Sequence, residues 1–117
     1  AGETVAEVAR AQGTEVGIEA RGGAAPSSHE HLKATLVETL GRAGYEPVVD
    51  AEDGTVRLRN CPYHALAVSH RDLTCGMNLA WAEGVVGGLA DPALDADLAP
   101  TPGHCCVVFD DASAPNE

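Results

Sequence analysis

Four cysteines and five histidines are the residues best suited to chemistry in this chain of 117 residues. Cys61 and Cys75 lie in the middle of the chain, and Cys105 and Cys106 are adjacent near its end. Zinc takes four nitrogen or sulfur ligands, and iron–sulfur clusters are held mainly by thiolates. The sequence therefore predicts a site for zinc or an iron–sulfur cluster. The alternative is that these cysteines pack as small hydrophobic residues.

The histidines divide into candidate ligands and surface residues. His64 follows Cys61 by about one helical turn, so the two side chains could chelate one ion, and His70 is a further candidate. Three histidines are predicted to be surface residues: His29, His31 and His104. The predicted metal ligands are Cys61, Cys75, Cys105, Cys106, His64 and His70.

The expected elements place these cysteines at corners of the fold. Pro62 fits the first position of a helix, with Asn60 or Cys61 as its cap, and Cys75 lies near the start of the next helix. A helix N-terminus favours the thiolate, which is the form that binds a metal. Cys105 and Cys106 begin the last strand, where neighbouring side chains point to opposite faces. We therefore expect at most one of these two thiols to face the site.

The rest of the chain predicts a small α+β domain. Ser27 and Glu30 form a capping-box pattern before a helix that ends near Gly44 and carries an apolar stripe at helical spacing: Leu32, Leu36, Val37 and Leu40. Asp53-Gly54 indicates the turn of a β-hairpin. One further expected element is a helix over 2–12, ended by Gly13, with Val5, Val8 and Ala9 on one side. The others are a helix over 62–70, a helix from Asp72 to Gly87-Gly88, and a second hairpin formed by LDADL and HCCVVF. The predicted fold class is α+β, with a small antiparallel sheet of two hairpins packed against three to four helices.

Three regions follow from this reading. Residues 1–28 are an N-terminal helix and a linker rich in Gly, Ala, Ser and Pro. Residues 29–110 are the metal- or iron–sulfur-binding domain, and residues 111–117 are a disordered tail.

Composition limits the partners. The formal net charge is −11, from 18 acidic and 7 basic side chains, so this polypeptide should not bind nucleic acid or an anionic membrane directly. We expect a cytoplasmic protein, because no signal peptide or membrane span is visible in the sequence. Disulfides are rare in that compartment, which favours metal binding or redox chemistry for the cysteines.

The segment NCPYHALAVSHRDLTCGMNLAWAEGVVGGL resembles the C-terminal domain of winged-helix transcription regulators of the ArsR/DeoR-like type. The resemblance covers roughly residues 32–109. This type of regulator includes the iron–sulfur repressors of the suf operon. The resemblance rests on Asn60-Cys61-Pro62, on Cys75-Gly76 and on the closing Gly103-His104-Cys105-Cys106. It implies a sensor domain, a winged helix before Ala1 that contacts DNA, and a homodimer.

The resemblance also implies a ligand set. The suf repressors hold their cluster with cysteines that match Cys61, Cys75 and Cys106 in this chain. They carry a further cysteine where this chain reads WAEGVVGGLADP, and Cys105 is an additional thiol here. Zinc held by Cys61, Cys75, one thiol of the Cys105–Cys106 pair, and His64 or His70 therefore competes with an iron–sulfur cluster.

Three functions are compared on these grounds. The first is a regulatory domain that senses a metal ion or cluster, and the second is a structural zinc domain without a sensing role. The third is a thiol redox protein or enzyme, with Cys61 as nucleophile beside His64. We do not expect an enzyme, because no third group that would orient such a pair stands out and the other cysteines would have no role.

Overall fold

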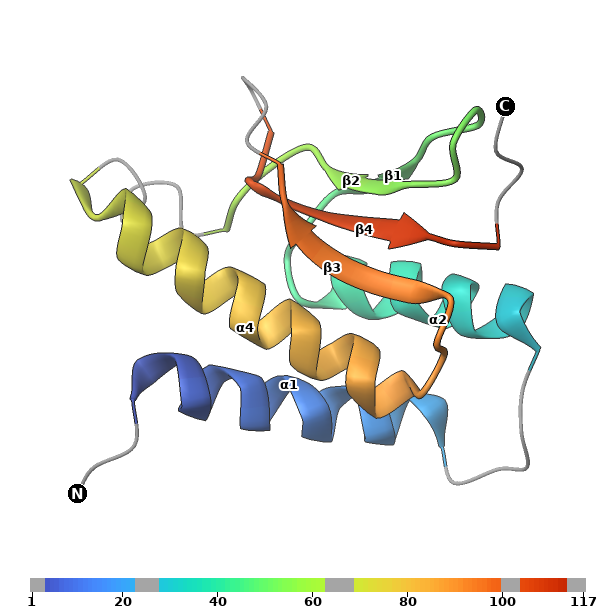
Figure 1. Ribbon diagram of the computed structural model, residues 1–117, viewed down its shortest axis with the longest axis horizontal. Coiled ribbons are helices and arrows are strands. Elements are labelled where there is room, and N and C mark those ends of the chain that lie inside the picture. Colours follow the sequence, from blue (N-terminus) through green and yellow to red (C-terminus); the bar gives the residue numbers. More distant parts are fainter. Residues whose placement is uncertain (1–3, 23–27, 63–68, 100–103, 114–117) are drawn as a thin grey trace.

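The computed structural model describes residues 4–22, 28–62, 69–99 and 104–113, and it confirms the predicted α+β fold (Figure 1). The described elements are α1 (Val5–Arg21), α2 (His29–Arg42), β1 (Pro47–Val49), β2 (Val56–Leu58), α4 (Arg71–Leu89), β3 (Leu94–Leu98) and β4 (Val107–Asp111). Residues 63–68 of the helix predicted over 62–70, including His64, lie outside the described residues. Within the described ranges, no helix combines the length and the apolar character that crossing a membrane requires.

The four strands form one antiparallel sheet in the order β1-β2-β4-β3. Both predicted hairpins are confirmed, and the pairing of β2 with β4 joins them. Gly54 has a φ of 74°, which the turn between β1 and β2 requires and glycine adopts without strain. Helices α2 and α4 cover one face of the sheet, and α1 lies on the side of α4 away from the sheet (Figure 1).

The core lies between the sheet and helices α2 and α4. On α2, the predicted stripe of Leu32, Leu36 and Leu40 is buried, one residue per turn. The largest fully buried side chains are Phe109, Leu36, Leu40, Leu58, Leu89, Val56, Val85 and Val107. The cap of α2 is Ser28, whose hydroxyl accepts from the backbone N–H of His31 at 3.1 Å, and not Ser27 as predicted.

Helix α1 does not end at Gly13 but continues to Arg21, so the predicted linker over 13–28 is wrong for its first nine residues. Gly13 and Gly17 are buried against α4. A Cβ atom at Gly13 would lie 2.1 Å from the carbonyl oxygen of Trp81, and one at Gly17 would lie 2.2 Å from that of Val85. The helix tolerates both glycines because they allow its backbone to approach α4 closely.

Helix α4 has the matching glycines. It runs through Gly87-Gly88, where a break was predicted, and ends at Leu89 before Ala90, whose φ is 61°. A Cβ atom at Gly84 would lie 2.2 Å from the carbonyl oxygen of Arg10, and one at Gly88 would lie 2.4 Å from that of Thr14. The two helices run in the same direction and meet backbone to backbone (Figure 1). The N-terminal helix is therefore packed onto the domain and is not a separate unit.

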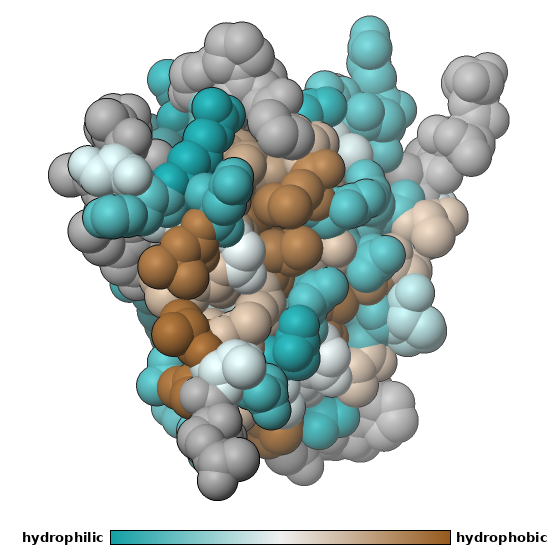
Figure 2. All heavy atoms as spheres, turned by 60° about the vertical axis from the view of Figure 1, so that its left-hand side comes forward, coloured by the Kyte–Doolittle hydropathy of each residue, from teal (hydrophilic) through white to brown (hydrophobic). Residues whose placement is uncertain are grey.

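The buried face of α1 consists of small residues. Ala9 is 7% exposed, whereas Val5 and Val8 are 52% and 39% exposed, so the prediction that all three share one apolar side is wrong for the two valines. Figure 2 shows apolar side chains reaching the surface between hydrophilic ones on the side that carries the start of α1 and α4. At the other end of the chain, Asp111 belongs to β4 and not to the predicted tail.

Candidate functional site

The four cysteines form one connected group, here called the thiol cluster. The thiol of Cys105 interacts electrostatically with those of Cys61 and Cys106, and the thiol of Cys106 interacts with that of Cys75. All four are free cysteines. Residues from the loop after β2, from the second turn of α4 and from the segment before β4 thus lie near one another.

The backbone around β4 positions two of these thiols. The N–H of Cys105 donates to the carbonyl of Leu58 at the end of β2 (2.9 Å), and the carbonyl of Cys106 accepts from the N–H of Ala99 after β3 (2.7 Å). Both cysteines therefore lie before the regular strand, which starts at Val107. The alternation expected of a strand does not apply to them, and both thiols contact the cluster instead of only one.

Burial controls the protonation of the inner thiols. Cys105 is 2% exposed and Cys106 is 8% exposed. Burial raises the pKa of both thiols, and their interactions with Cys61 and Cys75, respectively, raise it further. The thiols of Cys105 and Cys106 therefore stay protonated at neutral pH unless a bound cation displaces their protons. Cys61 and Cys75 are only partly buried and form the more accessible half of the cluster.

Asn78 connects the thiol cluster to the core. Its side chain, on the buried face of α4 about one turn beyond Cys75, donates from Nδ2 to the Sγ of Cys61 at 3.5 Å. Its Oδ1 accepts from the hydroxyl of Tyr45 at 3.1 Å, and the ring of Tyr45 stacks on Trp81 at a centroid distance of 5.9 Å. The sequence analysis did not identify Asn78. Its spacing of three residues from Cys75, which places both on one side of a helix, was the signal that could have identified it.

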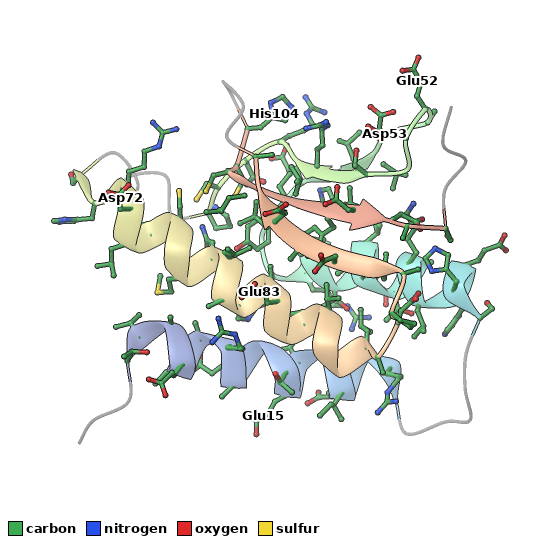
Figure 3. The ribbon with its side chains drawn as sticks, viewed as in Figure 1. Glu15, Glu52, Asp53, Asp72, Glu83 and His104 are labelled. Carbon is green, nitrogen blue, oxygen red and sulfur yellow. The ribbon has the colours of Figure 1, made fainter. Side chains whose placement is uncertain are left out.

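The predicted histidine ligands are placed differently from the cysteines. His70 is exposed at the N-cap of α4 and makes no side-chain capping bond. His104 is exposed at the end of the sheet (Figure 3). Asn60, a predicted helix cap, instead accepts from the N–H of Glu46 (2.6 Å) and donates to the carbonyl of Gly44 (2.9 Å). The structure thus assembles the four cysteines and leaves His70 at the surface.

The donor set suits a thiophilic cation by its chemistry. Over residues 4–22, 28–62, 69–99 and 104–113, no three His, Cys, Asp or Glu side chains are arranged to hold a metal ion as they stand. The buried thiols of Cys105 and Cys106 carry protons at neutral pH, whereas four thiolates around zinc lie about 2.3 Å from the ion. Metal binding would therefore release protons and draw the sulfurs toward a common centre.

The acidic side chains do not form a competing catalytic pair. Figure 3 shows Glu15, Glu52 and Asp72 at separate corners of the molecule. Asp110 is exposed on the outer face of the sheet, and its pKa is raised by partial burial and by the nearby Asp97, Asp95 and Asp53. This face is an acidic surface facing solvent.

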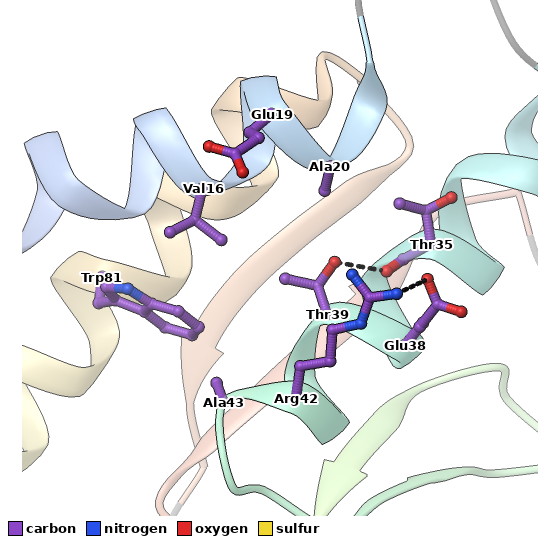
Figure 4. Close-up of a pocket in the computed structure, with 9 residues that line it drawn as sticks. All are labelled: Val16, Glu19, Ala20, Thr35, Glu38, Thr39, Arg42, Ala43 and Trp81. Carbon is purple, nitrogen blue, oxygen red and sulfur yellow. Dashed lines mark hydrogen bonds and ion pairs between the residues drawn. The ribbon is translucent and has the colours of Figure 1, made fainter.

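A groove of about 390 Å³ lies between α1, α2 and the Trp81 side chain of α4 (Figure 4). The hydroxyl of Thr39 donates to the carbonyl of Thr35 (2.7 Å), and Arg42 pairs with Glu38 (3.4 Å) at the rim. Since these polar groups satisfy one another, the groove supplies less chemistry than the thiol cluster.

Comparisons of this chain with protein-family models, with curated proteins and with solved structures give no match.

Proposed function

We propose that this chain is the regulatory domain of a bacterial transcription regulator and that its thiol cluster binds zinc or an iron–sulfur cluster. The observation that carries this proposal is the convergence of four cysteines from three separate segments. One buried cysteine can be explained by packing alone, whereas sulfurs that meet from three segments are the donor set that zinc and iron–sulfur clusters use. The resemblance of 32–109 to winged-helix regulators supplies the regulatory context.

The four thiols would hold the bound group, with no histidine required. The group supplies positive charge, which favours thiolates over thiols. Asn78 already donates to the sulfur of Cys61, and such an outer contact orients a ligand and stabilises its negative charge. The binding affinity falls as pH falls, because protons compete for the same sulfurs.

Helix α4 gives the thiol cluster a route to the rest of the molecule. Cys75 lies in its second turn, and its later turns contact α1 through the backbone at Gly84 and Gly88. Movement of Cys75 on metal binding would tilt α4, and α1 would follow because the two helices are in backbone contact. We propose that a DNA-binding part precedes Ala1 and that the regulator is a homodimer. The acidic domain itself makes no contact with nucleic acid.

The test is metal analysis of anaerobically purified protein, by visible absorption and by elemental analysis for zinc, iron and sulfide. We expect either one zinc per chain or a brown protein with iron and sulfide. The Cys61→Ser and Cys106→Ser variants should lose the bound group. His70→Ala and the exposed-residue control His31→Gln should retain it. A wild-type protein with neither metal after reconstitution, or a Cys61→Ser variant with full metal content, would overturn the proposal.

A further inference from the structure

His29 lies between two carboxylates, far from the thiol cluster in the sequence. Its Nδ1 is 2.5 Å from the Oδ2 of Asp91, and its Nε2 is 3.0 Å from the Oδ2 of Asp111. The His29 side chain is 26% exposed and both aspartate side chains are 5% exposed. The three side chains thus form a shielded bridge and not a chance contact at the surface.

The chemistry of the bridge fixes its protonation. An ionised carboxylate only accepts hydrogen bonds, and a neutral imidazole has one N–H. Two carboxylates can both be hydrogen-bonded to the same ring only when both ring nitrogens carry a proton. The geometry therefore calls for an imidazolium at position 29.

Other groups hold the two carboxylates in place. Lys33, on the next turn of α2, approaches Asp111 Oδ2 at 2.8 Å and the carbonyl of Gly54 at 2.7 Å. The Oδ1 of Asp91 accepts from the N–H of Ala93, and the Oδ1 of Asp111 accepts from the N–H of Ser113. Burial alone raises the pKa of Asp111, but the hydrogen bonds from Lys33, Ser113 and His29 outweigh it and hold that pKa well below its usual range.

These contacts join four parts of the fold. His29 and Lys33 belong to the first two turns of α2, and Asp91 lies between α4 and β3. Asp111 ends β4, and Gly54 lies in the turn between β1 and β2. The start of α2 is therefore held to the sheet and to the end of α4 by charge as well as by its leucines.

We propose that His29 is a pH-operated clamp: as the imidazolium it ties the first turn of α2 to Asp91 and Asp111, and loss of one proton releases that turn. The charged groups that face it are Asp91, Asp111 and, through Asp111, Lys33. The clamp does not involve the thiol cluster and does not depend on the proposed metal binding.

The direction of the pH effect follows from the bridge. The hydrogen bond to Asp111 raises the pKa of His29 above its ordinary value of 6.5, burial opposes this, and Asp91 raises it further. A raised pKa in the folded state stabilises the fold fully below the unfolded-state value. That contribution is lost as pH rises through the folded-state pKa, which lies above 6.5.

The test combines two measurements on the full chain. Nitrogen-detected NMR of the unmodified protein should show both ring nitrogens of His29 protonated at neutral pH, and a titration midpoint above 6.5. The difference in unfolding free energy between wild type and His29→Gln should shrink as pH rises above 6.5 and through the folded-state pKa of His29. His31→Gln, which removes an exposed histidine from the same turn, should leave the pH dependence of the wild type unchanged.

Two results would overturn the clamp. One is a His29 ring that carries a single proton at neutral pH in the unmodified protein, which needs no variant to fold. The other is a His29→Gln protein whose pH dependence of stability matches that of wild type. Amide exchange over residues 29–33 would locate the effect: protection factors, which correct for the base-catalysed rise of the intrinsic exchange rate, should fall at higher pH in this turn alone if the start of α2 is released.

Discussion

Asn78 is the polar residue that links the thiol cluster to the packed interior. Both polar atoms of its side-chain amide are hydrogen-bonded: the nitrogen donates to Cys61 and the oxygen accepts from Tyr45. With 3% exposure, it has little access to water as an alternative partner. A residue so placed stabilises one orientation of the Cys61 sulfur, whether or not a cation is bound.

Asn78→Ala should weaken both metal binding and folding. Loss of a donor to a ligand sulfur typically costs about 10- to 100-fold in metal affinity, and loss of a buried hydrogen bond costs about 1–3 kcal/mol. Zinc competition with a chromophoric chelator and urea unfolding would measure the two effects. Tyr45→Phe is the matched control, because it removes one hydroxyl and leaves the Asn78–Cys61 contact. An Asn78→Ala protein with wild-type affinity would show that Asn78 does not orient the sulfur.

Single residues differ in how far the sequence could place them. The convergence of the cysteines could be predicted because each stands at the end of an expected element. His29 was predicted to be solvated, since its partners Asp91 and Asp111 are 62 and 82 positions away. No local pattern reports such a bridge. The same holds for Asn78, whose partner Tyr45 lies 33 positions earlier.

The contact between α1 and α4 is the feature that matters most among the helices and strands. Four glycines, two on each helix, bring the backbones together where any Cβ atom would lie within 2.4 Å of a carbonyl oxygen. Arg10 and Glu83 add an exposed ion pair at 3.0 Å, which contributes little on its own. Backbone proximity thus defines this interface.

Gly84→Ala should therefore destabilise the protein, while Gly87→Ala should not. The added methyl at 84 meets the backbone of Arg10 and Thr14 and forces α1 away, at a cost of about 1–3 kcal/mol. The position at 87 faces open space on the same helix, so alanine there should raise stability by up to about 1 kcal/mol. Chemical unfolding of both variants checks this. Equal stabilities would mean that α1 does not pack closely on α4.

Periodicity explains why some elements were predicted well and others poorly. The leucines of α2 recur at helical spacing, so both the helix and its buried face could be predicted. The buried face of α1 is Ala9, Gly13 and Gly17, and glycine is ordinarily a sign that a helix ends. The error at Gly13 and at Gly87-Gly88 has this one cause. A pair of glycines four residues apart on each of two helices was the signal of close packing.

The molecule as a whole has one apolar core, which lies between the sheet and the helices. Phe109, Leu36 and Leu40 are fully buried between the sheet and the helices, and the thiol cluster lies at the start of α4. In the described part of the chain, no buried side-chain nitrogen or oxygen is without a hydrogen-bond partner. The proposed sensor would stay folded without its metal, whereas a structural zinc domain would depend on its metal to fold.

Removal of the metal should thus leave the chain folded but less stable. After chelation under reducing conditions, near-ultraviolet circular dichroism should retain the signal of the stacked Tyr45 and Trp81, and metal should restore stability according to its concentration. A structural zinc domain would instead unfold on chelation. Collapse of the aromatic signal upon metal removal would decide for that alternative.

The fold class could be predicted because the order of elements leaves few arrangements for a chain of this size. The pairing of β2 with β4, which joins the hairpins and brings Leu58 beside Cys105, could not be predicted from either hairpin alone. The three-residue length of β1 and β2 also gave too little pattern to fix a register between distant segments.

The glycine contact between α1 and α4 also constrains how this protein can vary. A cavity between side chains can be refilled when a neighbour grows, so such positions change in compensating pairs. Backbone atoms cannot shrink in return when one of these glycines acquires a side chain. Each of the four positions must therefore remain glycine, whatever its neighbours are. Substitutions in these two helices are expected mainly on their outer faces.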